Sequence, residues 1–301
     1  MMWWKKKNRI ICFDLGGTHL RKAVIDFSSE KPVFLDFQKK RNSVKKKITQ
    51  EMLDYAEKAG KKYRTDRVAI SSAGIVDGVA KKVFQAPQCY EKKVAGFSFL
   101  EKADFKVFLE NDGRSFGWGS FVFELKKKPK TVLSLAFGTG IGGGLIVGGE
   151  NYQGAHFSSL EFSHVFWGQP KKMMNKSENW EDLAGGRGLE KQYALLTQER
   201  KTAFEIFELA KKKDQSATRV LRIAKEQIAL GVANLINILD PEVIVLGGTM
   251  VTERKKYFKE AIQESQKWIF NQKIKPKVVF SSLGEKANLL GVGDLARKNL
   301  L

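Results

Sequence analysis

The alternation of apolar and polar positions predicts strands and helices from the start of the chain. Apolar, β-branched runs on both sides of a glycine turn predict a strand pair, and three later runs predict further strands. The five runs are "RIICFDL" (9–15), "LRKAVIDF" (20–27), "PVFLDF" (32–37), "RVAISSAG" (67–74) and "KVFLEND" (106–112). Apolar residues at helical spacing predict an amphipathic helix over 45–64. The apolar face of that helix consists of Ile48, Met52, Tyr55, Ala56 and Ala59.

The second half of the chain repeats the opening strand–turn–strand pattern. Residues 131–149 read "TVLSLAF", a glycine-rich turn, and "GLIVGG". Helical spacing predicts helices over 216–239 and 253–270, the first of them ended by Asp240–Pro241. Two apolar runs, "VIVLGG" (243–248) and "KVVFSS" (277–282), predict strands between and after these helices. This order indicates an α/β protein made of two halves, with no disordered linker between them.

Composition is typical of a globular protein. The 301 residues are 43% hydrophobic, which is enough for one large core or two ordinary ones. The two cysteines, Cys12 and Cys89, have no paired spacing, so a reducing cytosol fits better than a disulfide framework.

Asp14 interrupts the first apolar run, so a signal peptide is not expected. Residues 131–149 approach the length of a membrane span, but their glycines favour a turn between two strands.

The net charge of +20 raises the question of an anionic partner. Most lysines fall in short runs, at Lys5–Lys7, Lys45–Lys47, Lys126–Lys128 and Lys211–Lys213. A basic patch can bind nucleic acid or a membrane surface. These runs are scattered and lack interleaved aromatic residues, which favours a solvated surface instead. We therefore expect no specific nucleic acid and no membrane as partners, although the charge favours anionic ligands in general.

Two glycine turns are candidates for binding phosphate. In "FGTGIGGG" (137–144), successive backbone N–H groups without side chains can converge on phosphate oxygens. Glycine also serves tight hairpins and strand crossings, so that alternative stays open. In "DLGGT" (14–18), Thr18 offers a hydroxyl to phosphate. Asp14 ends a buried strand, where a Mg²⁺ ion bound directly or through water would justify a carboxylate. The alternative is an aspartate that caps the hairpin turn.

A third segment, "FLEND" (108–112), carries a candidate base. An apolar strand delivers Asn111 and Asp112 to its carboxyl end, where α/β sheets place their ligands. Asp112 can accept a proton from an attacking hydroxyl. The same two residues also suit the cap of a following helix, and both roles are compatible.

These segments, in this order, resemble the ROK family of sugar kinases in the actin-like ATPase superfamily. "CFDLGGTHLRKAVID" is similar to the family's first phosphate motif, and "LENDGRS" to its catalytic Asn-Asp. "LSLAFGTGIGGGLIVGG" is similar to the second phosphate motif, and "NLINILDPEVIVLGGTM" to the adenosine-side motif. The resemblance covers nearly the whole chain. It implies a two-domain actin-like, ribonuclease-H-like fold with a cleft between the domains.

The resemblance also implies a role for each matched residue. ATP·Mg²⁺ would lie in the cleft, and Asp112 would take the proton of the attacking sugar hydroxyl, taken to be that on carbon 6. The phosphate-binding residues would be Gly16, Gly17, Thr18, Gly138, Thr139 and Gly140, with Gly247 and Gly248 beside the adenosine. "SLEFSH" matches the family's Glu-x-x-His, and "WEDLAGGRGL" matches the segment after its zinc motif. The sugar-binding residues would then be Gly74, Asn111, Glu161, His164 and Glu181. Without the resemblance, Glu161 reads as a strand-edge charge and His164 as a core histidine.

Several positions depart from the family pattern. "KKMMNKSENWE" stands where the family has its Cys-x-Cys-Gly-x-x-Gly-Cys zinc motif, so no zinc is expected. His164 must then be held in another way, such as packing against Phe166 or Trp167. Gln88 stands where the family commonly has an asparagine near the sugar. Ala73 replaces a usual proline, and His19 a common lysine.

We therefore expect an ATP-dependent hexose kinase in the cytoplasm. The expected domains are 1–118, joined by a C-terminal helix over 286–301, and 119–285. Glucose is the leading substrate, followed by fructose, mannose, N-acetylglucosamine and N-acetylmannosamine. The alternatives are a non-catalytic sugar sensor, which Asp112 argues against, and a kinase that uses polyphosphate as donor. The family's repressors carry an N-terminal helix-turn-helix, and the first phosphate motif begins here by residue 14, too early for one. A homodimer is one expected assembly, since relatives are often dimers.

Overall fold

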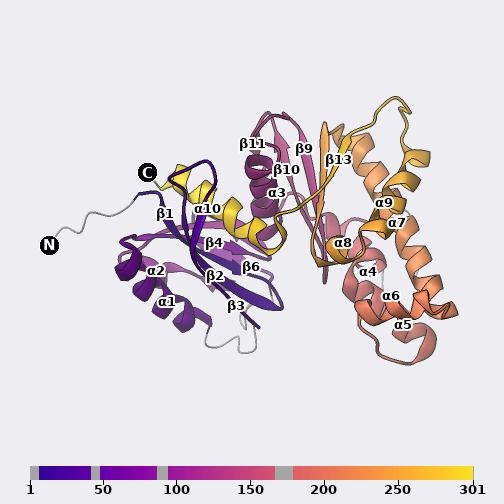
Figure 1. Cartoon of the computed structure of the whole chain (residues 1–301), viewed down its shortest axis with the longest axis horizontal. Coiled ribbons are helices and arrows are strands. Elements are labelled where there is room, and N and C mark those ends of the chain that lie inside the picture. The colour runs from indigo at the N-terminus through magenta and orange to yellow at the C-terminus, as the bar shows by residue number, and fades with distance from the viewer. Residues whose placement is uncertain (1–6, 42–47, 87–93, 167–178, 301) are drawn as a thin grey trace. The chain divides into compact units, whose positions relative to one another are not determined.

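The computed structural model describes residues 7–41, 48–86, 94–166 and 179–300. The chain divides into two compact units (Figure 1). Unit 1 comprises Met1–Lys128, Gly149–Ser159 and Glu285–Leu301, and unit 2 comprises Pro129–Gly148 and Leu160–Gly284. Each unit has a central sheet and a hydrophobic core of its own. The α/β class predicted from the sequence is confirmed.

The sheet of unit 1 has the strand order β3-β2-β1-β4-β8. β2 pairs antiparallel with both β1 and β3, whereas β4 pairs parallel with both β1 and β8. The strands are β1 (Arg9–Leu15), β2 (His19–Asp26), β3 (Val33–Arg41), β4 (Arg67–Ser72) and β8 (Lys106–Asn111). All five strands predicted for this part of the chain are confirmed.

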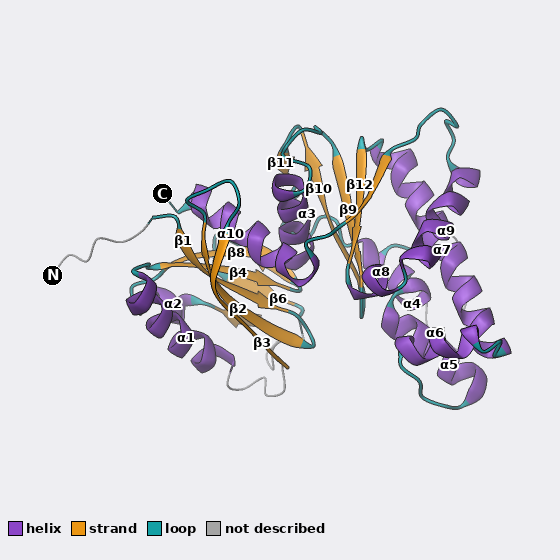
Figure 2. Cartoon of the chain, in the orientation of Figure 1, coloured by secondary structure: helices purple, strands orange, loops and turns teal. Residues whose placement is uncertain are grey.

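Helices cover both faces of this sheet (Figure 2). On one face, the ring of Phe13 meets that of Tyr55 in helix α1 (Ile48–Tyr63) with 5.7 Å between ring centroids. On the other face, helix α10 (Ala287–Asn299) packs against β1, β4, β8 and helix α3 (Asp112–Phe123). The predicted apolar face of α1 is confirmed, because all five of its residues are buried.

The remaining elements of unit 1 are short. A three-stranded antiparallel sheet was not predicted, because strands of three residues are too short to show a periodic pattern. Its strands are β5 (Ile75–Asp77), β6 (Lys82–Phe84) and β7 (Val94–Gly96). The other short elements are α2 (Ser98–Glu101), β11 (Glu150–Asn151) and the 3₁₀ turn η4 (Gly284–Lys286), which begins at the unit boundary.

The second sheet has the order β11-β10-β9-β12-β13, with all strands except β11 in unit 2. β10 is antiparallel to β9, and β12 is parallel to β9 and β13. The strands are β9 (Val132–Phe137), β10 (Ile141–Val147), β12 (Val243–Gly247) and β13 (Lys277–Phe280). The strand–turn–strand pattern predicted for residues 131–149 is confirmed.

Helices make up most of the rest of unit 2. They are η2 (Phe162–His164), α4 (Trp180–Ala184), α5 (Gly186–Thr197), α6 (Ala203–Lys211), α7 (Gln215–Leu239), α8 (Thr249–Glu253), α9 (Lys255–Ser265) and η3 (Gln266–Trp268). The helix predicted over 216–239 is confirmed, and Asp240 ends it in a left-handed conformation before Pro241. The helix predicted over 253–270 is interrupted at Arg254, which leaves helical geometry between α8 and α9.

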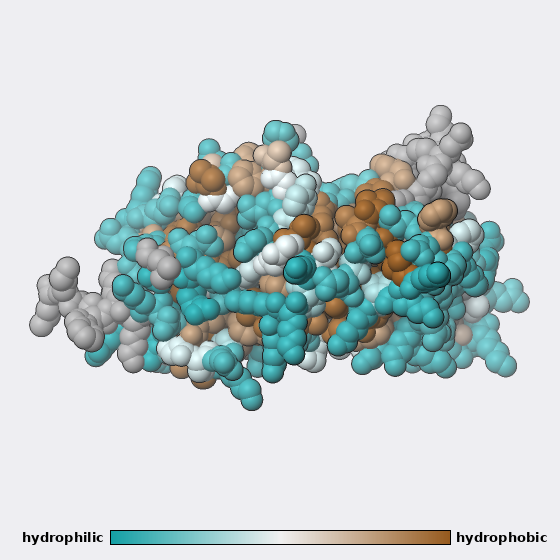
Figure 3. All heavy atoms as spheres, turned by 90° about the horizontal axis from the view of Figure 1, so that it is seen from above, coloured by the Kyte–Doolittle hydropathy of each residue, from teal (hydrophilic) through white to brown (hydrophobic). Residues whose placement is uncertain are grey.

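The lysine runs that the structure describes are on the surface. Lys126–Lys128 and Lys211–Lys213 are exposed, and hydrophilic residues cover most of the face drawn in Figure 3. Lys45–Lys47 and most of Lys5–Lys7 lie outside the described residues. The helices within the described part of the chain are all too short or too polar to cross a membrane.

The glycines of the β9–β10 hairpin differ in what surrounds them. A Cβ on Gly143 would lie 2.3 Å from the carbonyl oxygen of Ser134 and 2.9 Å from the ring of Phe162. A Cβ on Gly142 would meet no heavy atom within 4 Å. The Ser134 backbone and the packing of Phe162 therefore leave no room for a side chain on residue 143, and this requirement does not depend on any ligand.

Gly143→Ala is expected to lower the free energy of unfolding by about 1–3 kcal/mol, because the added methyl overpacks a filled site. Gly142→Ala, at the next position of the same strand, is expected to change it by less than about 0.5 kcal/mol. Urea unfolding of the two variants measures the difference. Equal effects of the two substitutions would contradict the assigned packing role of Gly143.

Candidate functional site

In unit 1 the predicted residues gather at one edge of the sheet. The register of β1, β4 and β8 places Leu15 opposite Ser72, and Ser72 opposite Asn111. The three strands are parallel, so their carboxyl ends meet at this edge. The turn 16–18, Gly74 and Asp112 follow directly after these ends. The structure thus brings together every unit 1 residue predicted for the site.

Asp14 is buried, with 3% of its surface exposed, and its carboxylate is fully engaged. Arg21 Nη1 donates to Asp14 Oδ2 at 2.9 Å. Ser71 Oγ and Asn288 Nδ2 donate to Oδ1 at 3.1 and 3.0 Å. The charge of Arg21 therefore compensates that of the buried carboxylate. These three donors lie outside the turn 16–18, so they do not support the alternative of an aspartate that caps this turn. The arrangement does not fit Asp14 as a direct Mg²⁺ ligand, because the ion would have to displace Arg21. Coordination through water stays a prediction.

The first glycine turn is open to solvent beside a group of cations. Gly17 and Thr18 are exposed, and the Gly16 amide donates to the carbonyl of His19 at 3.0 Å. Burial lowers the pKa of His19, and the positive charges of Lys39, Arg21 and Arg41 lower it further against an opposing effect of Glu285. His19 is therefore neutral at pH 7, and the fixed positive charge beside this turn comes from arginine and lysine.

Asn111 holds the start of α3 and contacts Gly74. Its Oδ1 accepts from the Arg114 amide at 3.1 Å, and its Nδ2 donates to the Gly74 carbonyl at 3.0 Å. The helix cap predicted from the sequence is therefore confirmed. Asp112 is the first residue of α3, and its Oδ1 accepts from the amide of Gly113 at 2.8 Å. Two predicted sugar residues thus touch directly, next to the predicted base.

A buried ion pair joins Glu110 and Arg114, which stand two residues before and after Asp112, and it was not predicted from the sequence. Glu110 and Arg114 each expose 2% of their side chains, and Arg114 Nε donates to Glu110 Oε1 at 2.6 Å. Glu110 Oε1 also accepts from the Asn111 amide at 2.7 Å. Glu110 lies in β8 and Arg114 in α3, so the pair joins two different elements and no helical spacing pointed to it.

The same pair fixes the segment 149–159 within unit 1. Gln153 Nε2 donates to Glu110 Oε2 at 2.9 Å, and Arg114 Nη1 donates to the Phe157 carbonyl at 3.2 Å. No local sequence signal points to these partners, since they lie some 40 residues along the chain. The strand end that carries Asn111 and Asp112 is therefore held from both sides by buried charge.

In unit 2 the second glycine turn and the adenosine-side glycines lie at one sheet edge. β9 and β12 are parallel, and Gly247 stands opposite Ala136. The turn 138–140 and Gly248 follow these strand ends. Gly248 has φ +90°, and a Cβ there would lie 2.3 Å from the Phe137 carbonyl oxygen. The two predicted nucleotide segments of this unit are therefore neighbours.

Glu161 directly precedes the short helix η2, and His164 is its last residue; η2 is joined to α4. The Trp180 amide donates to the Val165 carbonyl at 2.9 Å. His164 is exposed, so the alternative of a core histidine is wrong, and Glu161 precedes a 3₁₀ helix, so it is not at a strand edge. Asn179 Nδ2 lies 3.5 Å from His164 Nδ1, and Asn179 Oδ1 caps α4 by accepting from the Asp182 amide.

Asn179 is thus a polar neighbour of His164, the histidine that was expected to need another support in place of the family's zinc motif. Phe166 is exposed, and packing of His164 against Trp167 cannot be described because Trp167, like Gln88, lies outside the described residues. Within the described ranges, the structure places no group of three or more His, Cys, Asp or Glu side chains to hold a metal ion.

Glu181 lies against the second glycine turn. Its Oε2 accepts from the Ile141 amide at 2.9 Å, and a Cβ on Gly140 would lie 2.1 Å from the same oxygen. A side chain on residue 140 would therefore have to displace the Glu181 carboxylate from its present position. A residue predicted to bind sugar is in direct contact with a turn predicted to bind phosphate.

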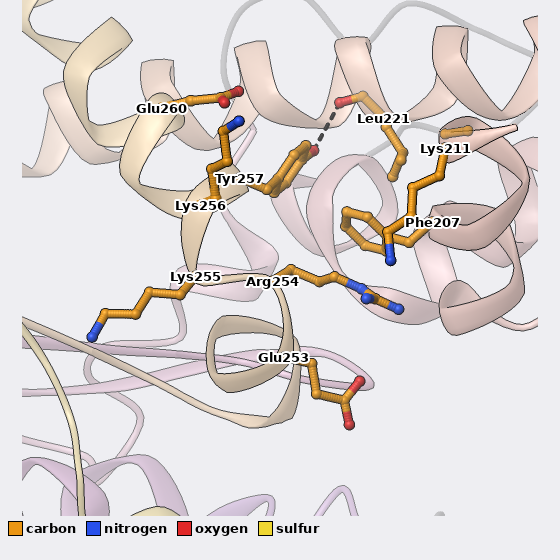
Figure 4. Close-up of a pocket in the computed structure, with 10 residues that line it drawn as sticks. Phe207, Lys211, Leu221, Glu253, Arg254, Lys255, Lys256, Tyr257 and Glu260 are labelled. Carbon is orange, nitrogen blue, oxygen red and sulfur yellow. Dashed lines mark hydrogen bonds between the residues drawn. The ribbon is translucent and has the colours of Figure 1, made fainter. Parts of the chain in front are cut away.

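A cavity of about 430 Å³ opens in unit 2 between α6, α7 and the α8–α9 junction (Figure 4). Phe207, Leu221 and Tyr257 form its apolar part. Its charged lining consists of Lys211, Glu253, Arg254, Lys255, Lys256 and Glu260. α8 begins directly after Gly248 and ends at Glu253, which is one of the lining residues.

A family model described as the ROK family matches residues 10–299 of the chain. The glucokinase of Streptomyces coelicolor is 25% identical over 307 residues, covering 95% of this chain and 96% of the relative. The xylose repressor of Bacillus subtilis is 24% identical over 307 residues, covering 99% of this chain and 79% of the repressor. The relatives therefore include both a kinase and a repressor at similar identity.

Solved structures share the fold over nearly the whole chain. A ROK family glucokinase from Streptomyces griseus, in complex with glucose and AMPPNP, has a TM-score of 0.80 and 24% identity, covering 96% of this chain and 99% of that one. A ROK hexokinase from Thermus thermophilus has a TM-score of 0.80 and 23% identity, covering 97% and 99%. The actin-like ATPase fold expected from the sequence motifs is confirmed.

Arg114→Met is expected to lower the free energy of unfolding by about 3–5 kcal/mol, because it leaves the buried Glu110 carboxylate without its counter-charge. The matched control is Arg222→Met, which removes an exposed i, i+4 pair with Glu226. That change is expected to cost less than about 1 kcal/mol. Thermal and urea unfolding compare the two variants. An equally small loss in both would contradict the assigned weight of the buried pair.

Proposed function

The chain belongs to the ROK family, and we propose that it transfers the terminal phosphoryl group of ATP to a hydroxyl of a hexose. Glucose, phosphorylated on carbon 6, is the first candidate substrate. Support comes from the matched glucokinase and from the motif residues of both units.

One observation carries the proposal. The in-register ends of β1, β4 and β8 bring a glycine turn, the Asn111–Gly74 contact and the Asp112 carboxylate to one sheet edge. A phosphate-binding turn and a candidate base on one rigid edge are what in-line transfer to a hydroxyl requires. Asp112 also suits the first turn of α3, so its role as the base depends on its place beside the glycine turn and the Asn111–Gly74 contact.

The proposed roles follow from phosphoryl-transfer chemistry. The transition state spreads negative charge over the transferred phosphoryl oxygens, so catalysis consists mainly of positioning and charge stabilisation. Mg²⁺ enters with ATP as part of the substrate. Thr18 and the turn amides of both units hold phosphate oxygens, and Glu161 and His164 hold sugar hydroxyls. Asp112 takes the proton as the sugar oxygen attacks the terminal phosphorus.

We assign the base of ATP to the cavity of Figure 4. Glu253, which lines the cavity, is five residues beyond Gly248, about 7.5 Å along α8 at 1.5 Å per residue. Its aromatic and aliphatic walls suit a planar base, and its lysines suit a nucleotide with a high negative charge. This assignment supplies the nucleotide specificity that glycine turns alone do not.

Two alternatives have specific support. The first is a sugar-sensing role without catalysis, which the similarity to a xylose repressor supports. The second is a kinase that uses inorganic polyphosphate as donor, which the net charge of +20 supports. A coupled assay of ADP release with glucose, fructose, mannose, N-acetylglucosamine and N-acetylmannosamine tests the kinase and ranks its substrates. The same assay, with polyphosphate in place of ATP and the sugar phosphate as readout, tests the donor. Sugar binding without phosphoryl transfer from either donor would support the sensor.

Asp112→Asn is expected to lower kcat by about 10²–10⁴-fold, because the amide cannot accept the proton of the attacking hydroxyl. Nucleotide binding, measured by calorimetry, should persist. The control is Asp104→Asn, which makes the same exchange in the turn that precedes the amino end of β8, where positive φ suits asparagine. Full activity of Asp112→Asn would remove Asp112 as the base.

Ala210→Trp is expected to raise KM for ATP about tenfold or more and to leave KM for the sugar within about twofold, because the indole fills the cavity. Phe204→Trp is the control on the same helix, since Phe204 is 56% exposed and does not line the cavity. Steady-state kinetics with each substrate varied separately measure both constants. An unchanged KM for ATP would place the base elsewhere.

A further inference from the structure

The second glycine turn is held in a fixed orientation by α5. The Gly186 amide donates to the Gly138 carbonyl, and the Arg187 amide donates to the Thr139 carbonyl, both at 2.9 Å. The Gly138 amide donates across the turn to the Gly140 carbonyl at 2.9 Å. With two carbonyls tied to α5, the turn cannot rotate to present a different set of amides.

On the side of the turn where the Ile141 amide points, the hydrogen-bond acceptor is a carboxylate. Glu181 Oε2 accepts from the Ile141 amide at 2.9 Å and fills the space that a Cβ on Gly140 would need. A carboxylate and a phosphate carry the same sign of charge and seek the same N–H donors. The contact therefore occupies part of the turn with an anion that belongs to the protein itself.

Helix α4, which carries Glu181, is linked to the predicted sugar residues. Asn179 and Trp180 join the start of α4 to η2, so Glu181 and the pair Glu161 and His164 belong to one connected part of unit 2. A polyol bound at Glu161 and His164 offers hydroxyl donors to the Glu181 carboxylate. Those donors can replace the Ile141 amide as its partner.

We propose that Glu181 is an internal competitor of the nucleotide phosphates, and that a bound sugar relieves the competition by drawing its carboxylate away from the Ile141 amide. The inference rests on the proposed function, because it takes the turn to bind phosphate and Glu181 to bind sugar. Sugar and nucleotide then bind cooperatively, and the coupling is reciprocal. In the absence of sugar the charge of Glu181 weakens nucleotide binding, which limits futile ATP hydrolysis.

The test is nucleotide binding by calorimetry without sugar, using adenosine, ADP and AMPPNP as probes. Glu181→Gln keeps an oxygen acceptor for the Ile141 amide and removes only the charge. The matched control is Asp182→Asn, because Asp182 is the adjacent carboxylate of α4 and pairs with Lys191 on the surface. Glu181→Gln is expected to bind ADP and AMPPNP about tenfold more tightly than the wild type. Adenosine binding, and all binding to Asp182→Asn, should stay within about twofold.

Unchanged or weaker binding of ADP and AMPPNP to Glu181→Gln would overturn the inference. So would an equal gain for adenosine, because that gain would not depend on phosphate charge. Failure of the proposed function gives a different result. If no hexose is phosphorylated but Glu181→Gln still binds ADP more tightly, the kinase assignment fails and the competition stands. If the wild type phosphorylates a hexose and Glu181→Gln shows no gain, the inference alone fails.

Discussion

The parallel pairing of strands is the constraint on which the candidate site depends. Parallel neighbours end at the same edge of a sheet, so residues far apart in sequence meet there through strand pairing, without a side-chain contact of their own. In unit 1, Leu15, Ser72 and Asn111 stand in register at that edge. In unit 2, Ala136 and Gly247 do the same. The candidate site residues of each unit are among the few that follow these strand ends.

Buried charge then fixes the geometry of the edge in unit 1. Asp14 is compensated by Arg21, and Glu110 is compensated by Arg114, each with further hydrogen bonds to neutral groups. A carboxylate taken out of water needs such partners, and satisfying them leaves little freedom to the backbone that carries it. Glu181 in unit 2 differs, because among the described contacts its partner is a neutral amide. Its carboxylate is therefore the least firmly held of these three.

The sequence predicted the fold well wherever periodicity was long. The face of α1 and the strands of both sheets follow directly from apolar spacing. The three-residue strands β5, β6 and β7 have no periodic signal, and the break at Arg254 coincides with contacts to Glu208, Phe204 and Phe207 on another helix. Such tertiary partners are invisible to a reading of local pattern.

The sequence predicted that the candidate site residues follow the ends of strands. It did not predict the side chains that hold these residues in place. The Asp14–Arg21 pair follows from hairpin register around the turn 16–18, so counting outward from the glycines would have found it. Glu110 lies in β8 and Arg114 in α3, so no periodic pattern within one element predicts their pairing, and their further partners lie in residues 149–159, which no spacing rule connects to them. The contact of Glu181 with Gly140 joins segments 40 residues apart, and only coordinates reveal it.

The placement of α10 has a consequence for how the chain is made. Asn288 donates to Asp14, and α10 covers the face of the sheet whose strands come first in the sequence. A ribosome therefore releases the strands of unit 1 long before the helix that completes them, whereas unit 2 already has all its segments when residue 284 emerges. We expect the later half to fold first during synthesis, and the earlier half to wait with an exposed apolar face for its last helix.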